Sequence, residues 1–439
     1  MIRLLYSLFL VLATPWLLLH LLLRSRRQPE YRDHWGERFG FYQLARPEGR
    51  LVWIHAVSVG ETRAAQALVS ELRNSFSDCA ILLTHMTPTG RATSEQLFGE
   101  GVLRCYLPYD YPFAVRQFLE HFKPTLGILI ETEVWPNLVA ECRRAQVHLV
   151  LANARLSAKS FKKAQRVGAL IRPALENLSS VLAQSRQDAD RLHLLGARHP
   201  IVTGNLKFDV APPQEQLDLG QSFRQLIGTR PVFLAASTRE GEEAVLLTAL
   251  QEALSGNSII PFPADALLVL VPRHPQRFDA VAQLLQLQGL SFQRRSAAST
   301  PPSPAEQLDP AVRVWLGDSM GEMFAYYAAA DIAFIGGSLL PLGGQNLIEA
   351  CAVGCPVLVG PHTFNFMQVT EDALSAGAAA RVSDAGDLMK QAGRILADPA
   401  RRGEMSEKAL RFTSAHRGAA QRTITILTRF IGPAKTSAR

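Results

Sequence analysis

Several carboxylates in this sequence stand directly after apolar runs, where parallel strands would end. Glu61 follows the run 51–56 after a short turn, and Glu131 and Glu133 follow the run 126–130. A buried carboxylate at such a place could act as a general base, because burial raises its pKa toward neutrality. The dipole of a helix that begins beside Glu61 acts in the opposite direction and is the ordinary reason for a glutamate there. Of Glu131 and Glu133, we expect one to cap the next helix and the other to face the same site as Glu61.

Basic side chains and turns in the second half of the chain are suited to binding phosphate. Arg273 and His274 follow the run 266–271, where the guanidinium could bind a phosphate or a base carbonyl. A basic surface loop is the alternative. The turn 317–322 follows the run 312–316 and offers backbone amides at the start of a helix.

A glycine-rich segment follows soon afterwards. The glycine pairs 336–337 and 343–344 would let the backbone approach a ligand closely. Asn346 is expected to cap a helix whose amides face a phosphate, and Glu349 could accept hydrogen bonds from ribose hydroxyls. The same Asn-x-x-Glu spacing equally suits a capping box.

Motifs that would indicate a metal or a cofactor are missing from the sequence. There is no P-loop, no GxGxxG after the first strand and no HExxH. Asp188 and Asp190 have metal-like spacing, but Ser185 and Asp188 fit the start of a helix better. The five cysteines are scattered and predict buried thiols. We therefore predict no metal site and no cofactor.

Short apolar runs alternate with amphipathic segments along most of the chain, which is typical of βα units in a parallel sheet. The predicted strands of the first half are 51–56, 80–84, 126–130, 148–152 and 181–183. After a polar, proline-containing linker at 205–216, the pattern resumes with strands at 232–235, 266–271, 312–316, 332–335 and 356–359. The sequence predicts an α/β fold of two doubly wound domains that face a cleft, with ligands beyond the carboxyl ends of the strands.

The segment 4–23 has twenty positions without a charged side chain, and Arg24, Arg26 and Arg27 follow it. As a helix it would be about as long as the hydrocarbon core of a bilayer is thick, ~30 Å. The basic residues favour a cytoplasmic location for the remainder of the chain. A buried or interfacial helix is the alternative. We predict that residues 1–27 are a single-pass membrane anchor.

The net charge of +7 indicates an anionic partner, which could be nucleic acid, a membrane surface or a phosphorylated substrate. Residues 142–175 contain eight basic and no acidic side chains. Five of them are spaced for one helix face: Arg155, Lys159, Lys162, Lys163 and Arg166. Each could contribute ~1 kcal/mol near an anionic leaflet. A solvated helix face is the alternative, but behind a membrane anchor we favour the membrane.

The turns of this chain, taken in order, resemble those of bacterial Kdo transferases. The motifs are HAVSVGET, THMTPTGRA, YLPYDYP, ETEVWPNL, LANARLSAKSF, GNLKFD, STREGEE, VPRHPQRF, GDSMGEM, GGQNLIEA and GPHTFNF. The resemblance runs from the apolar N-terminal segment, through ERFGFY at 37–42, to near the C-terminus. These enzymes transfer 3-deoxy-D-manno-octulosonic acid (Kdo) from CMP-Kdo to a lipid A precursor. The resemblance implies the GT-B architecture, with two Rossmann-like domains.

The resemblance also implies roles for individual residues. Glu61 would be the general base toward the acceptor hydroxyl, and Glu131 and Lys207 would stabilise the transition state. The implied CMP-binding residues are Arg273, His274, Met320, Gly321, Glu322, Asn346, Leu347, Ile348 and Glu349. Direct displacement with one base would invert the anomeric centre, and lysine and helix amides could stabilise the departing phosphate without a metal. Arg239 and Gln345 depart from the family pattern, because histidine is usual at both positions.

We expect an anchor at 1–27, an acceptor-binding domain at 28–210 and a CMP-sugar-binding domain at 211–432. The expected partners are CMP-Kdo, a lipid A precursor (lipid IVA) and the anionic cytoplasmic leaflet of the inner membrane. Nucleic acid is the least favoured partner, because the basic segments lack the interleaved aromatic residues of RNA-binding motifs. Two alternatives remain open: a GT-B transferase for another sugar nucleotide, and a membrane-tethered binder of nucleotide or nucleic acid.

Overall fold

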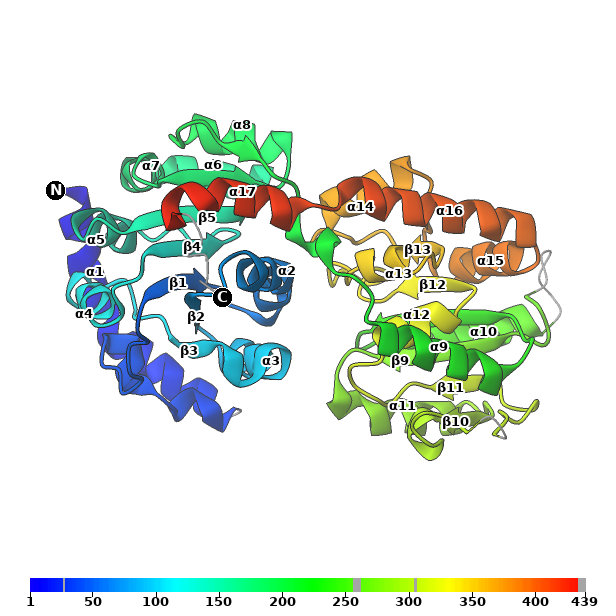
Figure 1. Cartoon of the computed structure of the whole chain (residues 1–439). Coiled ribbons are helices and arrows are strands. Elements are labelled where there is room, and N and C mark those ends of the chain that lie inside the picture. The colour runs from blue at the N-terminus through cyan, green and yellow to red at the C-terminus, as the bar shows by residue number, and fades with distance from the viewer. Residues whose placement is uncertain (27, 256–261, 304–305, 433–439) are drawn as a thin grey trace, which may run out of the picture. The chain divides into compact units, whose positions relative to one another are not determined.

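The computed structural model describes residues 1–26, 28–255, 262–303 and 306–432, and it divides into two compact units. The first unit contains Met1–Val210 and His416–Arg439, and the second contains Ala211–Ala415. Each unit is built on a seven-stranded parallel sheet with helices between successive strands (Figure 1). The predicted α/β fold of two doubly wound domains behind an apolar N-terminal helix is confirmed. Arg27, the last residue of the expected anchor, lies outside the described residues.

The first sheet has the strand order β3-β2-β1-β4-β5-β6-β7, so the direction of winding reverses between β1 and β4. Its strands are β1 (Arg50–His55), β2 (Cys79–His85), β3 (Leu103–Tyr106), β4 (Leu126–Ile130), β5 (His148–Ala154), β6 (Ser180–Ala183) and β7 (Ile201–Val202). Residues 51–55 of β1 are fully buried, as expected for a central strand that is covered on both faces. In such a sheet, ligands bind beyond the carboxyl ends of the strands where the winding reverses.

The helices of the first unit lie between these strands in the chain, except that α1 precedes β1 and α17 follows the second unit. They are α1 (Ile2–Ser25), α2 (Val59–Ser75), α3 (Pro88–Phe98), α4 (Pro112–Phe122), α5 (Pro136–Arg144), α6 (Ala158–Arg166), α7 (Gly168–Glu176), α8 (Arg186–Leu194) and α17 (Ala419–Ile431). The expected basic helix face begins later than predicted. Since α6 starts after the cap residue Ser157, Arg155 lies in the turn before the helix.

Helix α17 belongs to the first unit, although the sequence analysis assigned residues 211–432 to the second domain. Its apolar residues Ile424, Leu427 and Ile431 are buried in the same core cluster as β1 and α2. The Asp209 carboxylate accepts hydrogen bonds from the backbone N–H groups of Gly418 (2.6 Å) and Ala420 (2.5 Å) at the start of α17. The sequence alone could not show this pairing, because the partners are separated by the whole of the second unit.

The second sheet has the order β10-β11-β9-β8-β12-β13-β14 and reverses between β8 and β12. Its strands are β8 (Val232–Thr238), β9 (Leu267–Pro272), β10 (Phe292–Arg294), β11 (Val314–Leu316), β12 (Ile332–Ile335), β13 (Val357–Val359) and β14 (Ala379–Arg381). The helices are α9 (Gln214–Ile227), α10 (Glu242–Leu254), α11 (Phe278–Leu287), α12 (Met323–Ala329), α13 (Ile348–Ala352), α14 (Met367–Ser375), α15 (Ala385–Leu396) and α16 (Pro399–His416).

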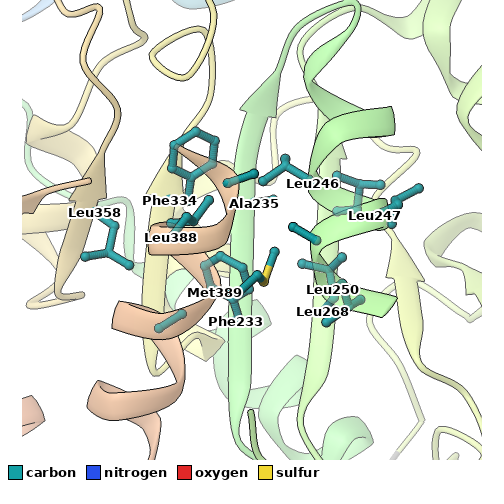
Figure 2. Packing of buried hydrophobic residues seen from close by; sticks show 14 of the residues in the cluster. Phe233, Ala235, Leu246, Leu247, Leu250, Leu268, Phe334, Leu358, Leu388 and Met389 are labelled. Carbon is teal, nitrogen blue, oxygen red and sulfur yellow. The ribbon is translucent and has the colours of Figure 1, made fainter. Parts of the chain in front are cut away.

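The core of the second unit is formed where helices pack on the central strands. Figure 2 shows Phe233 and Ala235 of β8 between leucines of α10 and residues of α15, among them Leu388 and Met389. Phe334 of β12 extends this cluster across the reversal point. Helix packing therefore holds β8 and β12 in place, and with them the starts of the loops that follow these strands.

Helix α1 is long and apolar enough to cross a membrane, by length and composition. One of its faces packs on α5 and α7 of the first unit. The other sides of the helix carry exposed apolar residues, including Leu4, Phe9, Leu12 and Trp16. Among the described residues it is the one helix that meets these criteria.

We expect Asp209→Ala to lower the free energy of unfolding by about 1–3 kcal/mol, because two N–H groups at the start of α17 lose their acceptor. Urea unfolding followed by circular dichroism measures the change. Asp190→Ala is the matched control, since Asp190 is exposed and pairs with Arg186, which is also exposed. An equal shift of both midpoints would show that Asp209 does not hold α17 in place.

Candidate functional site

The carboxyl ends of β1 and β4 lie side by side at the reversal point of the first sheet. The turn after β1 leads into α2, and the turn after β4 leads into α5. These turns contain Glu61 and Glu131, two of the three residues expected to carry the chemistry. The arrangement is therefore set by the topology, before any side chain is considered.

Glu61 lies in the first turn of α2, as predicted. The Val57 N–H donates to its Oε2 at 2.7 Å, and the Ser58 hydroxyl donates to Oε1 at 3.1 Å. The pKa of Glu61 is raised to about 7, mainly by burial; the carboxylates of Glu133 and Glu131 contribute to the rise, and the two hydrogen bonds oppose it. Burial thus outweighs the stabilisation available at a helix start. The result is a carboxylate that exchanges a proton near neutral pH.

Glu131 has a left-handed backbone conformation, with φ of 63°. Such a conformation in a glutamate needs support from its surroundings. The Glu131 N–H bonds to the Ala152 carbonyl at 3.0 Å, and the Lys207 Nζ donates to Glu131 Oε1 at 2.8 Å. Both side chains of the ion pair are mostly buried, so water screens their attraction little.

Lys207 reaches this site from the short 3-10 turn Leu206–Asp209, 76 residues beyond Glu131. The Asn153 side chain at the end of β5 accepts a hydrogen bond from the Leu206 N–H at 3.0 Å. The Asn205 side chain accepts one from the Lys207 N–H, also at 3.0 Å. Two side-chain amides therefore fix the backbone that presents the lysine.

Glu133 completes a cluster of three carboxylates. The Trp135 Nε1 donates to Glu133 Oε2 at 3.0 Å, and the Trp135 ring packs edge to face on His55, with ring centroids 5.4 Å apart. Burial raises the pKa of Glu133, and the charge on Glu131 adds to this rise against the bond from Trp135. From the sequence, Glu133 was one of two glutamates that could face this site, and the expected catalytic residue was Glu131. The polar triplet after a buried strand was the signal that could have identified it.

The expectation that Glu131 or Glu133 caps the next helix is wrong. Helix α5 is capped instead by Asp110, which precedes α4: its carboxylate accepts from the N–H groups of Asn137 (3.0 Å) and Leu138 (2.7 Å). Proline at the start of α5 leaves fewer amides to satisfy. Because Asp110 takes the capping role, both glutamates are available to the cluster.

Two other polar segments cap helices, and the sequence indicated the second of these caps. The Thr87 hydroxyl accepts from the Gly90 N–H at 3.1 Å at the start of α3. The Ser185 hydroxyl accepts from the Asp188 N–H at 3.2 Å at the start of α8. Across the described ranges, no three His, Cys, Asp or Glu side chains come together in a way that could hold a metal ion.

In the second unit, the turns after β8 and β12 meet through a buried carboxylate. Glu242 is fully buried and accepts hydrogen bonds from the N–H groups of Arg239, Gly337 and Leu339. Gly336 allows close packing, because a Cβ there would lie 2.5 Å from the Ser237 carbonyl oxygen. This glycine therefore serves contact between the two turns rather than contact with a ligand. Glu242 was not singled out from the sequence, although two adjacent acids before an apolar helix were a visible signal.

Arg273 and His274 follow β9, as predicted. The Arg273 N–H bonds to the Thr238 carbonyl at 2.9 Å, which ties this turn to the end of β8. Partial burial lowers the pKa of His274, and the positive charges of Arg273 and Arg239 lower it further. Basic side chains from two neighbouring strand ends therefore gather at this edge.

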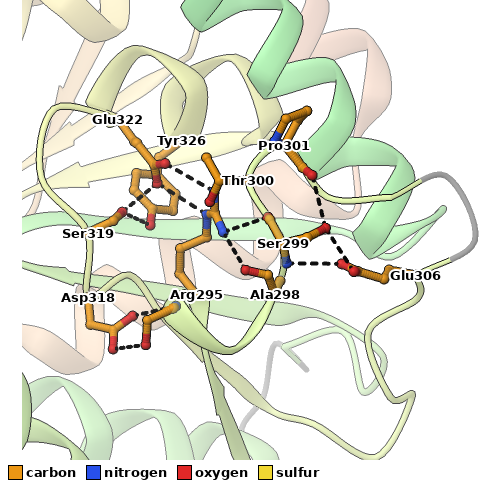
Figure 3. A network of polar contacts seen from close by, with 11 residues as sticks. Arg295, Ala298, Ser299, Thr300, Pro301, Glu306, Asp318, Ser319, Glu322 and Tyr326 are labelled. Carbon is orange, nitrogen blue, oxygen red and sulfur yellow. Dashed lines mark hydrogen bonds and ion pairs between the residues drawn. The ribbon is translucent and has the colours of Figure 1, made fainter.

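The expected CMP-binding residue Glu322 is engaged by a buried arginine. Arg295 donates to Glu322 through Nη2 at 3.1 Å and through Nε at 3.2 Å, and Ser319 donates to the same carboxylate at 2.5 Å (Figure 3). A forked pair of this kind fixes orientation as well as charge. Glu322 thus holds the turn after β11 in shape.

Neighbouring residues of the same turn are more open. Met320 is 58% exposed, and Gly321 has a left-handed backbone, with φ of 82°. Asp318 accepts from the N–H and the hydroxyl of Ser296, which ties the turn to the segment after β10. Met320 is therefore the member of this segment best placed to meet a ligand.

Asn346 does not cap the helix in the way the sequence suggested. Helix α13 begins at Ile348 and has five residues, with Leu347 in the cap position. The Asn346 Oδ1 accepts from the Ile348 N–H at 3.1 Å, and its Nδ2 donates to Glu349 Oε1 at 3.1 Å. Leu347 and Ile348 are buried, so they position the segment rather than face solvent.

The two departures from the family pattern lie close together in space. A Cβ on Gly337 would lie 3.1 Å from Gln345 Nε2 and 3.5 Å from Arg239 Cγ. The side chains of Arg239 and Gln345 therefore border the same glycine turn. The two departures therefore affect a single turn of the second unit.

Comparisons with known proteins identify the family. A family model described as 3-deoxy-D-manno-octulosonic-acid transferase (kdotransferase) matches residues 33–210. The chain is 50% identical over 386 residues to the 3-deoxy-D-manno-octulosonic acid transferase of Bordetella pertussis, covering 87% of each chain. It is 35% identical over 430 residues to the enzyme of that name in Haemophilus influenzae, covering 97% of this chain and 98% of the other.

A comparison of structures supports the fold. The UDP-GlcNAc 2-epimerase of Neisseria meningitidis, bound to UDP-GlcNAc, aligns with a TM-score of 0.59 at 15% identity. The alignment covers 87% of this chain and all of that one. Together with the two doubly wound units, this likeness indicates the GT-B fold. As its motifs predicted, the chain belongs to the Kdo transferases, the glycosyltransferases of lipopolysaccharide biosynthesis.

Proposed function

We propose that this protein transfers Kdo from CMP-Kdo to a lipid A precursor, with inversion at the anomeric carbon and without a metal ion. The observation that carries the proposal is Glu61, a carboxylate whose pKa of about 7 suits a general base, beside the Glu131–Lys207 ion pair. The first unit would bind the acceptor and the second the donor. The reaction would take place at the cytoplasmic face of the inner membrane, where α1 and the basic surface of the first unit hold the enzyme.

The reaction requires one proton transfer and one displacement. The Glu61 carboxylate takes the proton of the acceptor hydroxyl, and the oxygen forms a bond to the anomeric carbon of Kdo. The bond from that carbon to the phosphate oxygen breaks, and CMP leaves with the electron pair. The Val57 and Ser58 hydrogen bonds keep the Glu61 carboxylate in one orientation, which favours transfer along a fixed direction.

Lys207 supplies positive charge close to the base. The donor carries a carboxylate on its anomeric carbon, so negative charge surrounds the reacting centre. A preorganised ammonium stabilises such charge without reorganisation during the reaction. Glu131 holds the Lys207 ammonium at 2.8 Å and would act through it.

The second unit offers the chemistry of a nucleotide site. Arg273 with Arg239 provides guanidinium groups for a phosphate, and the exposed Met320 offers an apolar contact for a base. Glu349, bonded to Asn346, carries the carboxylate proposed to accept from ribose hydroxyls. Helix α13 has only five residues, so we assign phosphate binding to the arginines rather than to a helix dipole.

Incubation of the purified full chain with CMP-Kdo and a lipid A precursor, followed by mass spectrometry of the lipid, tests the proposal. We expect a mass gain of one or more Kdo units with CMP-Kdo and none with UDP-sugars. A gain with a UDP-sugar instead would support a GT-B transferase of another specificity. Absence of any transfer, with CMP still bound, would favour a nucleotide-binding protein.

We expect Glu61→Gln to reduce kcat by ~10²–10⁴-fold, the usual contribution of a general base. In the wild type the base must be deprotonated, so the logarithm of kcat/KM should fall with unit slope below an apparent pKa near 7. The pH profile of CMP release measures this limb. Glu95→Gln, an exposed change on α3, should leave rate and profile unchanged.

Stability provides an independent check on the same residue. The folded-state pKa of Glu61 lies above its ordinary value of 4.5, so its protonation stabilises the fold below pH 4.5 and this contribution is lost as pH rises through 7. Glu61→Gln should therefore be more stable than wild type above pH 7, by ~2–3 kcal/mol at most, and equal to it near pH 4. A variant that is destabilised at every pH would contradict burial as the cause.

Variants of the Glu131–Lys207 pair distinguish a structural role of the pair from a catalytic one. Lys207→Met leaves a buried carboxylate without its partner, so we expect a stability loss of about 3 kcal/mol. The double variant Glu131→Gln with Lys207→Met should recover most of that stability, since no unpaired charge remains. Its kcat should stay at least tenfold below wild type. Recovery of activity together with stability would show that the pair is only structural.

Arg273→Ala should weaken the binding of CMP by about tenfold or more, the cost of one charge-assisted contact. Isothermal titration of the full chain with CMP measures this affinity. Arg401→Ala, on the exposed side of α16, is the matched control. Glu61→Gln should bind CMP as tightly as wild type, because Glu61 belongs to the first unit. Unchanged affinity in Arg273→Ala would remove this arginine from the donor site.

A further inference from the structure

Helix α1 differs from a surface helix of a water-soluble protein, because its outward side chains are mostly apolar. Its half-buried and buried positions recur every three or four residues and include its small polar side chains: Ser7, Leu10, Thr14, Leu17, Leu21 and Ser25. Its exposed positions are almost all apolar: Ile2, Leu4, Leu5, Leu8, Phe9, Val11, Leu12, Trp16, Leu19, Leu22 and Leu23. The helix thus turns its hydroxyl side chains Ser7, Thr14 and Ser25 to the protein, and its outward side chains are apolar apart from Arg3, His20 and Arg24.

The inward polar groups bond to the folded first unit along the helix. Asn137 Nδ2 donates to the Ser7 hydroxyl at 3.0 Å, and the Thr14 hydroxyl lies 2.7 Å from the Tyr111 hydroxyl. The Tyr111 hydroxyl also bonds to the Leu10 carbonyl at 3.2 Å. At the carboxyl end, Arg32 Nε, in the turn that follows the helix, donates to the Ser25 hydroxyl at 3.0 Å. The bonds to residues distant in the sequence run from Ser7 to Thr14, ~11 Å at 1.5 Å per residue.

The partners of α1 are integral to the fold. Asn137 is 1% exposed and Tyr111 is 3% exposed. Both neighbour Asp110, which caps α5 and accepts from the Asn137 N–H. If α1 crossed a bilayer, this part of the first unit would have to enter the hydrocarbon with it, or the hydrogen bonds would break. Either outcome is costly, because polar groups in hydrocarbon lack partners.

We propose that α1 stays docked on the first unit and lies in the plane of the membrane surface, with its outer apolar face among the acyl chains of one leaflet. The inference deepens the proposed membrane location and rests on it, but not on the identity of the sugar donor. It departs from the single-pass anchor expected from the sequence. The amino terminus then stays on the same side of the membrane as the rest of the chain.

Charge around α1 favours a lipid occupant for this face. Arg3 at one end of the helix and Arg24 and Arg26 at the other are exposed. Helix α7 contacts both α1 and the basic helix α6. The basic side chains of α6 are all exposed: Lys159, Lys162, Lys163 and Arg166. Basic residues beside an apolar helix face match anionic headgroups above acyl chains.

A pocket at the amino end of α1 could hold an acyl chain of a lipid. It lies between α1, α5 and α7, and its walls are mainly apolar, with Ile2, Val139, Leu170 and Pro173 among them. Arg3 lies at the same pocket. An acyl chain could enter beside the helix while its headgroup meets the guanidinium.

The test determines on which side of the membrane the amino terminus lies. A short Gly-Ser extension with one cysteine is placed ahead of Met1 in a Cys79→Ser background, since Cys79 is partly exposed and the other four cysteines are buried. Inner-membrane vesicles of both orientations are treated with a membrane-impermeant maleimide. We expect labelling in inverted vesicles and at least tenfold less in right-side-out vesicles. The opposite pattern means that α1 spans the membrane and overturns the proposal.

A variant pair links the result to the docking contacts. Ser7→Leu with Thr14→Leu removes the polar contacts and makes the helix more apolar, so a several-fold larger share of the cysteine should become reactive from the other side. The control pair Leu8→Ala with Leu12→Ala lies on the exposed face and should leave the sidedness unchanged. If the two pairs behave alike, the hydrogen bonds do not set the orientation.

Flotation with vesicles separates this inference from the proposed membrane location. The full chain should float with phosphatidylethanolamine vesicles that contain phosphatidylglycerol, and less without it. Failure to float with either overturns both the lipid occupant and the membrane location. If the chain instead dimerises through α1 in solution, a second copy covers the face and the lipid occupant is overturned. Flotation together with labelling from the opposite side would overturn only the in-plane arrangement.

Discussion

The crowding of three carboxylates at one edge of the first sheet is the constraint on which the site depends. Burial raises the pKa of Glu61 and of Glu133, and the charge on Glu131 adds to both rises. Lys207 forms an ion pair with Glu131, and the Trp135 indole donates a hydrogen bond to Glu133. Glu61 is held by a backbone amide and a hydroxyl, whose hydrogen bonds do not offset burial. Glu61 therefore exchanges a proton near neutral pH.

The surrounding fold supports this crowding. The reversal of strand order brings the turns after β1 and β4 together. Asp110 caps α5, so neither Glu131 nor Glu133 is needed as the cap. Asn153 fixes the turn that presents Lys207, and Glu131 keeps its left-handed backbone through a bond to β5. Asn153 accepts through its Oδ1, whereas its buried Nδ2 and the Nε2 of His55 beside Trp135 have no hydrogen-bond partner among the described residues.

The second unit repeats the topology with the opposite electrostatic character. Its winding also reverses between two central strands, and a buried carboxylate, Glu242, is used to tie the turns together through backbone amides. The side chains left at the edge include Arg239 and Arg273. Similar sheets thus present an acidic site in one unit and a basic site in the other, which suits a base for one substrate and a phosphate-bearing second substrate.

The sequence by itself determined the inner strands, the turns after them and the family, because long buried strands and turn motifs are recorded in contiguous residues. The strands that it did not identify are the edges of the two sheets, β3, β7, β10 and β14, which have four residues or fewer and are partly exposed. Such strands need no apolar run. Tertiary structure alone decided the pKa of Glu61, the pairing of Lys207 with Glu131, the return of α17 and the inward polar face of α1. Each of these depends on groups far apart in the chain, and burial and hydrogen bonding between them exist only once the chain has folded.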